Sequence, residues 1–454
     1  MKLPQSLLTL SSFALLTLRV TSQQQFLSTA QDDQSSPIDI PTLLSFHKSL
    51  VNIPSVTGSE YNVSKFLASH LHGLNFTVEH QPVNSSSTSD AQPRYNLLAY
   101  PSQCSRDTPI LLTSHMDTVP PFCPYRRTAS EFDADPIDTA LVSDLATTDP
   151  ALLHPITLHG RGSVDDYASL VAQVTALTRL LHSQQIPPCS TALLFVVGEE
   201  VDGAGMRAAN ALNPGWRAVL FGEPTENRLA SGHKGITFLT IRAEGQSGHS
   251  GYPWLAVSAN ALMVKALGAV QALAEGMLEE KLPRSKKFGN TTVNIGRIEG
   301  GVAGNVIAER AEALVTMRLA GGTLREVKRV VGDVVDEATK GMLDEAEREG
   351  KHAKVMAEWS TNGYAPVNLD TDVNVWDEED EEIETKRLSK GPITVNYGTD
   401  VPNLDGDHKR YLYGPGSILV AHSDHEAITV GDLVKGVEGY ERLLQGVVKN
   451  LDID

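Results

Sequence analysis

Short apolar segments alternate with helical patterns in the first half of the chain, and this alternation is the strongest constraint on its fold. Residues 60–72 and 165–181 place apolar side chains at helical spacing. The strand-like segments near them are NFTVEH, RYNLLAY, PILLTSHM, TALLFVVG and RAVLFGE. Strands that alternate with helices in this way indicate an α/β domain with a mainly parallel sheet and flanking helices.

The pattern changes after residue 234, where strands and helices follow in the order βαββαβ. The strand-like segments are now GITFLTIRAEG, TTVNIGRIEG, AERAEALVTMRLA and HAKVMAEWS, with two long helical patterns among them. This order is the split βαβ motif of ferredoxin-like domains. A chain of 454 residues is also longer than one hydrophobic core usually supports. We therefore predict a larger domain in two parts, residues 23–234 and 360–454, with a second domain inserted at residues 235–359.

The first 22 residues have the pattern of a secretion signal. Lys2 is followed by an apolar run, and small residues stand at Val20 and Ser22. A membrane anchor is the alternative, but the run is interrupted by polar residues and is short for a bilayer. The formal net charge of −18 argues against nucleic acid or an anionic membrane as a partner. We expect a secreted, extracellular glycoprotein without residues 1–22. The four candidate glycosylation sequons are at Asn62, Asn75, Asn84 and Asn290.

Three cysteines allow one disulfide and leave one thiol over. Cys104 and Cys123 bracket a single strand-like segment, so we expect this pair to be bonded and Cys189 to be free. The chain has no CxxC motif, and a zinc site built from thiolates is therefore not indicated.

Histidines and carboxylates follow several of the strand-like segments. In open α/β sheets the carboxyl ends of the strands form the ligand crevice, so these side chains should converge there. Without a cation they would repel one another, whereas one or two divalent metal ions would balance them. Histidine with Asp or Glu, and no Cys, is typical of a catalytic zinc site. The candidate residues are His115, Asp117, Asp165, Asp166, Glu199, Glu200, Glu223, His422 and Glu426.

Seven ordered motifs carry a resemblance to a known family. They are SHMDTVP, GRGSVDD, GEEVDGAG, GEPT, HKG, GQSGHS and AHSDHEAI, between about residues 40 and 448. The chain in this region resembles the zinc exopeptidases and deacylases, which include acetylornithine deacetylase, succinyl-diaminopimelate desuccinylase, aminoacylase and glutamate carboxypeptidase. The resemblance implies that the larger domain is catalytic, with the zinc exopeptidase fold, and that the inserted domain is a lid or dimerisation domain.

The resemblance also implies a centre of two Zn²⁺ per subunit. Asp165 would bridge the two ions. His115 and Glu223 would complete the ligands of one ion, and Glu200 and His422 those of the other. Two metals of this kind share a hydroxide and polarise the scissile carbonyl. Asp117 would orient His115 through a hydrogen bond, and Glu199 would act as general base. A cis peptide between Asp165 and Asp166 is implied as well.

Three residues of the inserted domain resemble substrate-binding positions of the family. They are His249, which helps to hold the oxyanion, Asn305 and Arg318. In dimeric members the histidine reaches the active site of the other subunit, so a homodimer through the inserted domain is expected. A guanidinium such as that of Arg318 suits a substrate carboxylate, because it is a bidentate donor that stays charged.

Several of these polar residues also have ordinary structural explanations. Asp166 could be an acid at a helix start, Arg318 could lie on a strand surface, and Glu426 could be structural. Tyr167 and Ala168 stand where many relatives have Lys-Gly, which leaves the metal ligands intact but affects the substrate pocket. The remaining histidines are expected at the surface: His47, His70, His72, His80, His182 and His352.

The resemblance implies a secreted two-zinc metallo-exopeptidase. The preferred activity is that of a carboxypeptidase, which hydrolyses the amide bond next to a free C-terminal carboxylate. The alternative is an N-acyl-amino-acid deacylase of the acetylornithine deacetylase or aminoacylase type. A third interpretation is an inactive secreted binding protein with the same fold, but Glu199 and every proposed ligand are present.

Overall fold

A computed structural model describes residues 37–84, 92–128, 153–212, 215–279, 281–375 and 391–453. The proposed signal at residues 1–22 lies outside the described residues. Within them, no helix is both long enough and apolar enough to cross a membrane.

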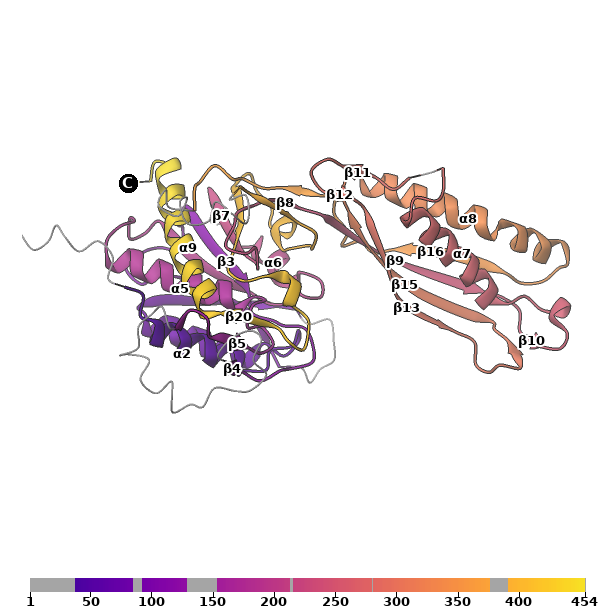
Figure 1. Cartoon of the computed structure of the whole chain (residues 1–454), viewed down its shortest axis with the longest axis horizontal. Coiled ribbons are helices and arrows are strands. Elements are labelled where there is room, and N and C mark those ends of the chain that lie inside the picture. The colour runs from indigo at the N-terminus through magenta and orange to yellow at the C-terminus, as the bar shows by residue number, and fades with distance from the viewer. Residues whose placement is uncertain are drawn as a thin grey trace, which may run out of the picture. The chain divides into compact units, whose positions relative to one another are not determined.

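A six-stranded sheet forms the centre of the larger domain (Figure 1). Its strand order is β1-β2-β6-β3-β7-β19, and only β2 of these six runs against the others. Every residue of β3, β6 and β7 is buried, as expected for parallel strands covered on both faces. The strands are β1 (Phe76–Val83), β2 (Arg94–Pro101), β3 (Ile110–His115), β6 (Thr191–Val196), β7 (Ala218–Gly222) and β19 (Lys409–Tyr413).

Helices flank this sheet. The helices α5 and α9 pack against each other, and α5 contacts β3, β6 and β7 (Figure 1). The helices α3 and α6 contact β1 and β2. Two of the helices, α2 and α6, were not anticipated from the sequence. The bounds are α2 (Ile40–Val51), α3 (Tyr61–Gly73), α5 (Tyr167–His182), α6 (Ala204–Ala209) and α9 (Val430–Asn450).

Two small three-stranded sheets complete the larger domain. In one, β5 (Thr157–His159) lies between β20 (Ala427–Thr429) and β4 (Arg126–Thr128). In the other, β8 (Ala230–His233) lies between β17 (Val367–Asn368) and β18 (Ile393–Val395). Both sheets therefore join segments that are far apart in the sequence.

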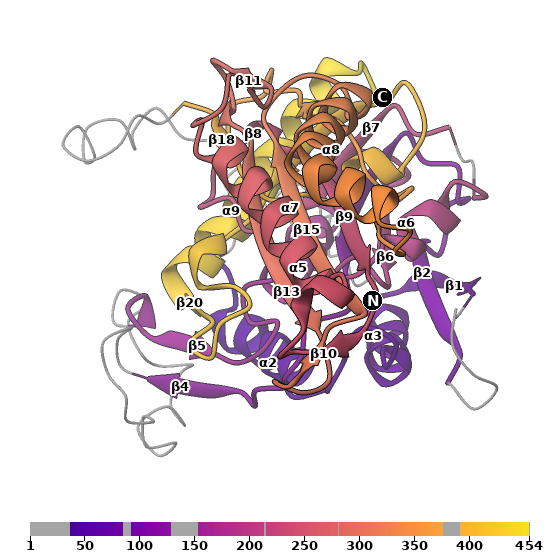
Figure 2. The ribbon, with the colours of Figure 1, turned by 90° about the vertical axis from the view of Figure 1, so that its right-hand side faces the viewer.

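The inserted domain has a four-stranded antiparallel sheet in the order β13-β15-β9-β16. Its helices α7 and α8 lie side by side on one face of the sheet and form a shared core with it (Figure 2). Their N-caps, Ser258 and Thr323, accept hydrogen bonds from backbone N–H groups of the first turn. The elements are β9 (Gly235–Glu244), α7 (Ala259–Ala274), β13 (Thr292–Gly300), β15 (Arg310–Leu319), α8 (Leu324–Arg348) and β16 (Lys354–Trp359).

The predicted fold class is confirmed in both of its parts: a mainly parallel α/β sheet with flanking helices, and a ferredoxin-like βαββαβ unit. Short ribbons extend the second unit. They pair β10 (Gly248–His249) with β14 (Val306–Ile307), and β11 (Arg284–Ser285) with β12 (Gly289–Asn290).

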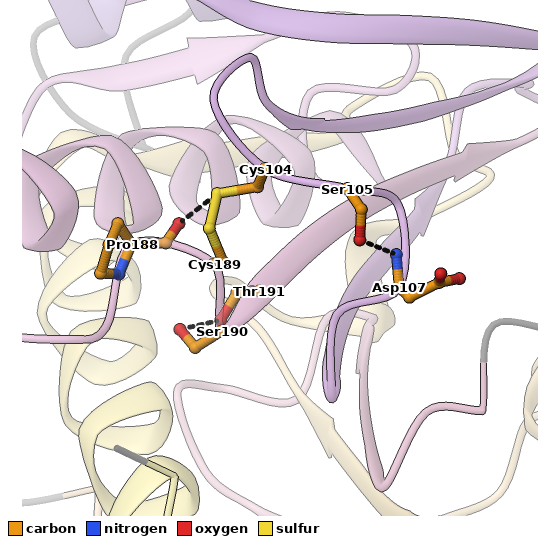
Figure 3. Close-up of a disulfide and its surroundings, with 7 residues drawn as sticks. All are labelled: Cys104, Ser105, Asp107, Pro188, Cys189, Ser190 and Thr191. Carbon is orange, nitrogen blue, oxygen red and sulfur yellow. Dashed lines mark hydrogen bonds between the residues drawn. A yellow bond between two sulfur atoms is a disulfide. The ribbon is translucent and has the colours of Figure 1, made fainter.

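The expected disulfide is wrong: Cys104 is bonded to Cys189 (Figure 3). Cys123 is the free thiol. Cys104 follows β2 and Cys189 precedes β6, and these strands are antiparallel neighbours, so their adjoining ends bring the two Cα atoms to 5.5 Å. Cys123 follows the opposite end of β3. A strand between two cysteines separates them, because it carries the chain across the sheet.

The surface placement expected for His47 is also wrong. Its side chain is fully buried, and Nε2 donates a hydrogen bond of 2.8 Å to the backbone oxygen of Ser163. Burial lowers the pKa of His47 to about 4, so the ring is neutral. The residue lies on α2, the unanticipated helix, and this is why its environment was not foreseen.

Candidate metal centre

Side chains with metal-binding chemistry lie at the carboxyl ends of three neighbouring strands. His115 is the last residue of β3, Glu223 directly follows β7, and Glu199 and Glu200 follow β6. Two further positions come from connecting segments. Asp165 lies just before α5, and the last, His422, follows the short helix η5 (Ile418–Val420).

Asp165 lies between two histidine rings. Its Oδ1 is 3.0 Å from Nε2 of His115, and its Oδ2 is 3.2 Å from Nε2 of His422. The same nitrogen of His422 is 3.0 Å from Oε2 of Glu200. One carboxylate oxygen thus faces each histidine, which is the arrangement that a bridging ligand requires. The peptide bond that follows Asp165 is cis, as the resemblance implies.

Two overlapping groups of side chains could each hold a metal ion. The ligand atoms of His115, Asp165 and Glu200 lie within 4.8 Å of one another, and so do those of His115, Glu199 and Glu223. The five predicted ligand positions therefore come together in one place, together with the predicted base. Most of these side chains are buried, whereas that of His422 is 51% exposed.

Burial acts against the charged form of the carboxylates. It raises the pKa of Glu199 and of Glu223 well above the usual range, and neighbouring carboxylates add to both shifts. Burial also opposes ionisation of Asp165, but the hydrogen bonds from His115 and His422 bring its pKa below the ordinary value. The same contacts, with Asp165 and Glu200, raise the pKa of His422 to about 10. Without a metal ion, Glu199, Glu223 and His422 would therefore tend to hold protons.

These acids lack a paired basic side chain in the part of the chain that the structure describes. Among the described residues, no lysine or arginine forms an ion pair with Asp165, Glu199, Glu200 or Glu223, and the recorded partners are histidines. Buried carboxylates without a counter-charge are costly. Imidazole nitrogens and carboxylate oxygens are also the ligands that catalytic zinc prefers. The residues present therefore fit divalent metal ions.

Asp117 orients two segments of the site. Nδ1 of His115 donates a 2.9 Å hydrogen bond to the backbone oxygen of Asp117, which leaves Nε2 free to face Asp165. The hydrogen bond predicted between His115 and the carboxylate of Asp117 is not formed, because Oδ1 of Asp117 lies 3.7 Å from Nδ1 of His115. That carboxylate instead accepts hydrogen bonds from the backbone N–H groups of Glu199 and Glu200, at 3.1 and 3.3 Å. It thereby holds the turn that carries both glutamates.

Asp166 does not cap the helix α5. Its side chain is fully buried, makes no capping hydrogen bond, and has no hydrogen-bond partner for either oxygen among the described residues. Burial raises its pKa to about 7, with a further contribution from Asp165. Asp166 therefore stands at the N-cap position of α5 without a capping hydrogen bond from its side chain.

A cavity of about 480 Å³ opens beside the candidate ligands. It is lined by Asp165, Glu199 and Glu223, and also by Tyr364 and Tyr397, which sequence reasoning missed. The hydroxyl of Tyr397 donates a 3.0 Å hydrogen bond to the backbone oxygen of Pro224 and so fixes the segment that carries Glu223. The motif NYGTD follows β18, so the strand-end rule that found the other residues could have found Tyr397.

Arg318 reaches the same cavity from β15. The residue is half-buried, and its guanidinium has no hydrogen bond or ion pair with any residue that the structure describes. Burial lowers the pKa of Arg318, against the influence of Tyr364 and Glu199. A Cβ placed on Gly398 would lie 3.2 Å from Nη1 of Arg318 and 2.2 Å from the hydroxyl of Tyr364, so a glycine keeps this corner open. The arginine is therefore not an ordinary surface residue.

Comparisons with known proteins agree with this geometry. Residues 231–342 match the family described as "Peptidase dimerisation domain". The chain is 45% identical over 426 residues to a protein of Aspergillus oryzae named "Probable carboxypeptidase", with 91% of this chain and 89% of that protein covered. It is 39% identical to a "Peptidase M20 domain-containing protein" of Sordaria macrospora, with 91% and 86% covered.

The chain belongs to the M20 family of metallopeptidases. A solved structure with a similar fold is the M20 family metallo-carboxypeptidase from Sulfolobus solfataricus, at a TM-score of 0.59 and 15% identity. That match covers 89% of this chain and 98% of the other. The protein is thus a hydrolase of the M20 family.

Two of the predicted substrate-binding residues of this M20 peptidase lie apart from its cavity. His249 ends β10 and Asn305 directly precedes its partner strand β14; both residues are exposed and neither lines the cavity. Nδ1 of His249 accepts a hydrogen bond from the backbone of Gly251, and Asn305 accepts one through its backbone oxygen from Ser250. Of the three predicted substrate contacts, only Arg318 shares a cavity with Glu199.

Proposed function

We propose that this M20 peptidase is a secreted carboxypeptidase with two Zn²⁺ per subunit. It would hydrolyse the amide bond that precedes a C-terminal residue with a free carboxylate. One observation supports this activity above all others: the half-buried guanidinium of Arg318, which has no partner among the described residues, lines the cavity that also contains Glu199 and Asp165.

Five residues would hold the metals. Asp165 would bridge the ions, His115 and Glu223 would bind one of them, and Glu200 and His422 would bind the other. The contacts of Asp165 with the two histidines support this division of ligands. When bound, the zinc ions supply Lewis acidity that polarises the scissile carbonyl.

Glu199 would move the proton. It lies next to the proposed ligand Glu200, is close to His115 and Glu223, and lines the cavity that a substrate would enter. It would accept a proton from the attacking water and donate it to the leaving amine. Asp117 would keep it in position through the backbone N–H group of Glu199.

Arg318 would recognise the substrate terminus. A guanidinium donates two parallel N–H groups to a carboxylate, and a hydrogen bond of this charged kind contributes about 1.5–3 kcal/mol. The open corner at Gly398 leaves room for the carboxylate between Arg318 and Tyr364. A substrate with an amidated terminus would leave the guanidinium partly desolvated without a partner.

Three observations support secretion and glycosylation. The first 22 residues have the pattern of a signal peptide. The Cys104–Cys189 disulfide suits an oxidising compartment. The four sequon asparagines, Asn62, Asn75, Asn84 and Asn290, are all exposed and therefore accessible to glycosylation.

A homodimer through the inserted domain is part of the proposal. The match of residues 231–342 to a dimerisation domain supports it. The position of His249 outside the cavity supports it too, because a histidine that acts in the site of another subunit need not reach the site of its own chain. Substrates would be peptides, and neither nucleic acid nor a membrane is a proposed partner.

A paired-substrate assay tests the proposed activity. One N-terminally blocked dipeptide is offered with zinc as the free acid and as the C-terminal amide, beside the N-acetyl form of its last residue. We expect cleavage of the free acid at least about tenfold to a hundredfold faster than of the amide, from the affinity arithmetic of one charged contact. Equal cleavage of acid and amide would contradict the carboxypeptidase, and preferred cleavage of the N-acetyl amino acid would indicate the deacylase instead.

A further inference from the structure

A single carboxylate, that of Glu426, joins the segments that carry two of the proposed metal ligands. Its Oε1 accepts hydrogen bonds from the backbone N–H groups of Val164 and Asp165, at 3.2 and 3.3 Å. The backbone oxygen of Glu426 accepts a third hydrogen bond, from the N–H group of Gly160, at 3.2 Å. Because Glu426 lies four residues after His422 in the sequence, the turn with the bridging aspartate is tied to the segment of that histidine.

Arg161 ties the same turn to a third segment. Its Nη1 pairs with Oε2 of Glu426 at 2.6 Å. Its Nε donates to the backbone oxygen of Pro121 at 3.2 Å, and its own N–H group donates to that of Cys123 at 3.0 Å. Pro121 and Cys123 belong to the segment that leaves β3 after His115. Three ligand-bearing segments thus meet at one ion pair.

Glu426 is not itself free to bind a metal. Its Oε2 receives the guanidinium and its Oε1 receives two backbone N–H groups, so both oxygens already have partners. Both side chains of the pair are only 2% exposed. A buried ion pair contributes little net stability compared with apolar side chains of the same volume, so stability alone gives no reason for this arrangement. The position that the pair gives to the ligand-bearing segments is a reason for it.

We propose that the Arg161–Glu426 pair is a clamp that sets the spacing of the metal ligands, with Glu426 as a positioning residue. The clamp holds Asp165 at the distance from His115 and His422 that a bridging carboxylate needs. Residues outside the ligand set that orient the ligands typically change metal affinity by about 10–100-fold when they are replaced. The proposal rests on the proposed two-zinc function.

The test measures zinc affinity of the full-length protein, separately from activity. Metal is removed by a chelator, and zinc is titrated back against a chromophoric competitor while circular dichroism follows the fold. In Glu426→Gln a single amide oxygen cannot serve both Arg161 and the N–H groups of the turn. We expect zinc to bind about 10–100-fold more weakly in this variant, which remains folded.

The matched control is Glu441→Gln. Glu441 accepts a 2.6 Å hydrogen bond from Nε of Arg179 in a partly buried ion pair between α9 and α5, and neither residue contacts a proposed ligand. We expect this control to lower the thermal midpoint without changing zinc affinity. Arg161→Lys is a second variant, which keeps the charge beside Glu426 but has no planar fork to reach Pro121 as well. We expect it to stay folded and to bind zinc more weakly than the wild type.

A double variant distinguishes the loss of ligand positioning from the effect of leaving a buried charge without a partner. In Arg161→Gln with Glu426→Gln no buried guanidinium is left without a partner, but the segments are still untied, so we expect weak zinc binding to persist. Wild-type affinity in the double variant, or in folded Glu426→Gln, would overturn the clamp. A wild-type protein that takes up no zinc would overturn the two-zinc function and the clamp together.

Discussion

Two acidic regions of the molecule differ in whether basic side chains pair with their carboxylates. On the face of the inserted sheet that α7 and α8 do not cover, Arg242 pairs with Glu312 at 2.8 Å and also with Glu358. Arg297 pairs with Glu312 as well, at 2.8 Å. In the candidate metal centre, four acids lie together and no described lysine or arginine pairs with them.

The environments of the acids differ accordingly. Glu312 lies in contact with solvent, and its hydrogen bond with Arg242 lowers its pKa. Glu223 is buried and Glu199 is half-buried, and desolvation raises the pKa of each. The surface region carries its own arginine counter-charges, whereas the acids of the candidate metal centre have only histidine partners among the described residues and fit cations from solution. A cluster of acidic residues therefore does not by itself indicate a metal site. The stronger indication is a cluster of desolvated acids that no lysine or arginine pairs with.

The largest expected effect concerns Glu199, the acid of the buried region that is not a proposed ligand. Glu199→Gln removes the proton acceptor, and we expect turnover to fall by about 10²–10⁴ while zinc content is unchanged. Steady-state rates together with elemental analysis of the purified variant measure both quantities. Loss of zinc from this variant would place Glu199 among the ligands.

The neighbouring Glu200 gives the contrast. Glu200→Gln removes a carboxylate oxygen beside His422, so we expect weaker binding of one zinc ion and partial recovery of activity at high zinc concentration. The same zinc titration and rate measurement apply. Identical zinc content and rates in the two glutamine variants would show that the adjacent acids share one role.

The next effect concerns Arg318, the cation that faces the buried region from the inserted domain. Arg318→Lys keeps a positive charge but loses the planar fork, so we expect at least about a tenfold fall in kcat/KM for free-acid peptides. Cleavage of the corresponding amide should hardly change. Full activity of the lysine variant would mean that bidentate recognition is not needed.

A further effect is the dependence of stability on pH. Burial raises the pKa of Glu199, Glu223 and Asp166, the last to about 7, so the folded metal-free protein holds more protons than the unfolded chain. These groups therefore lower its stability as pH rises from about 4 to about 7. Bound zinc keeps the carboxylates ionised. We expect the difference in thermal midpoint between zinc-loaded and metal-free protein to widen by several degrees over this window, as scanning calorimetry can measure.

The smallest effect is expected in the exposed region. Arg242→Gln removes a cation from a solvent-exposed network, where ion pairs contribute little because water screens them. We expect unchanged zinc content and activity, and a thermal midpoint close to that of the wild type. A loss of zinc in this variant would break the distinction between the two regions.

The sequence was sufficient for the features that depend on local patterns. The buried strands β3, β6 and β7 are continuous apolar runs, and the residues that follow them must meet at one edge of a parallel sheet. His115, Glu200 and Glu223 could be found for this reason. The ferredoxin-like unit was predictable because its alternating helices and strands follow one another without a long interruption.

The features that depend on contacts between distant segments were not predictable. The Cys104–Cys189 bond depends on which strands are neighbours, and the pairing of β2 with β6 is not a local property. The burial of His47 depends on where α2 packs. The Arg161–Glu426 pair joins residues 265 positions apart, and although Glu426 was a candidate from its motif, nothing in the sequence indicated Arg161 as its partner. Spacing along the chain contains no information about such contacts.

Crystallography of the zinc-loaded protein tests the central claim most directly. Anomalous scattering at the zinc absorption edge locates the ions without reference to activity. The account predicts two peaks about 3.5–4 Å apart, one on each side of the carboxylate of Asp165, with His115 and Glu223 near one and Glu200 and His422 near the other. A zinc-loaded crystal with no peak between these residues would contradict the account.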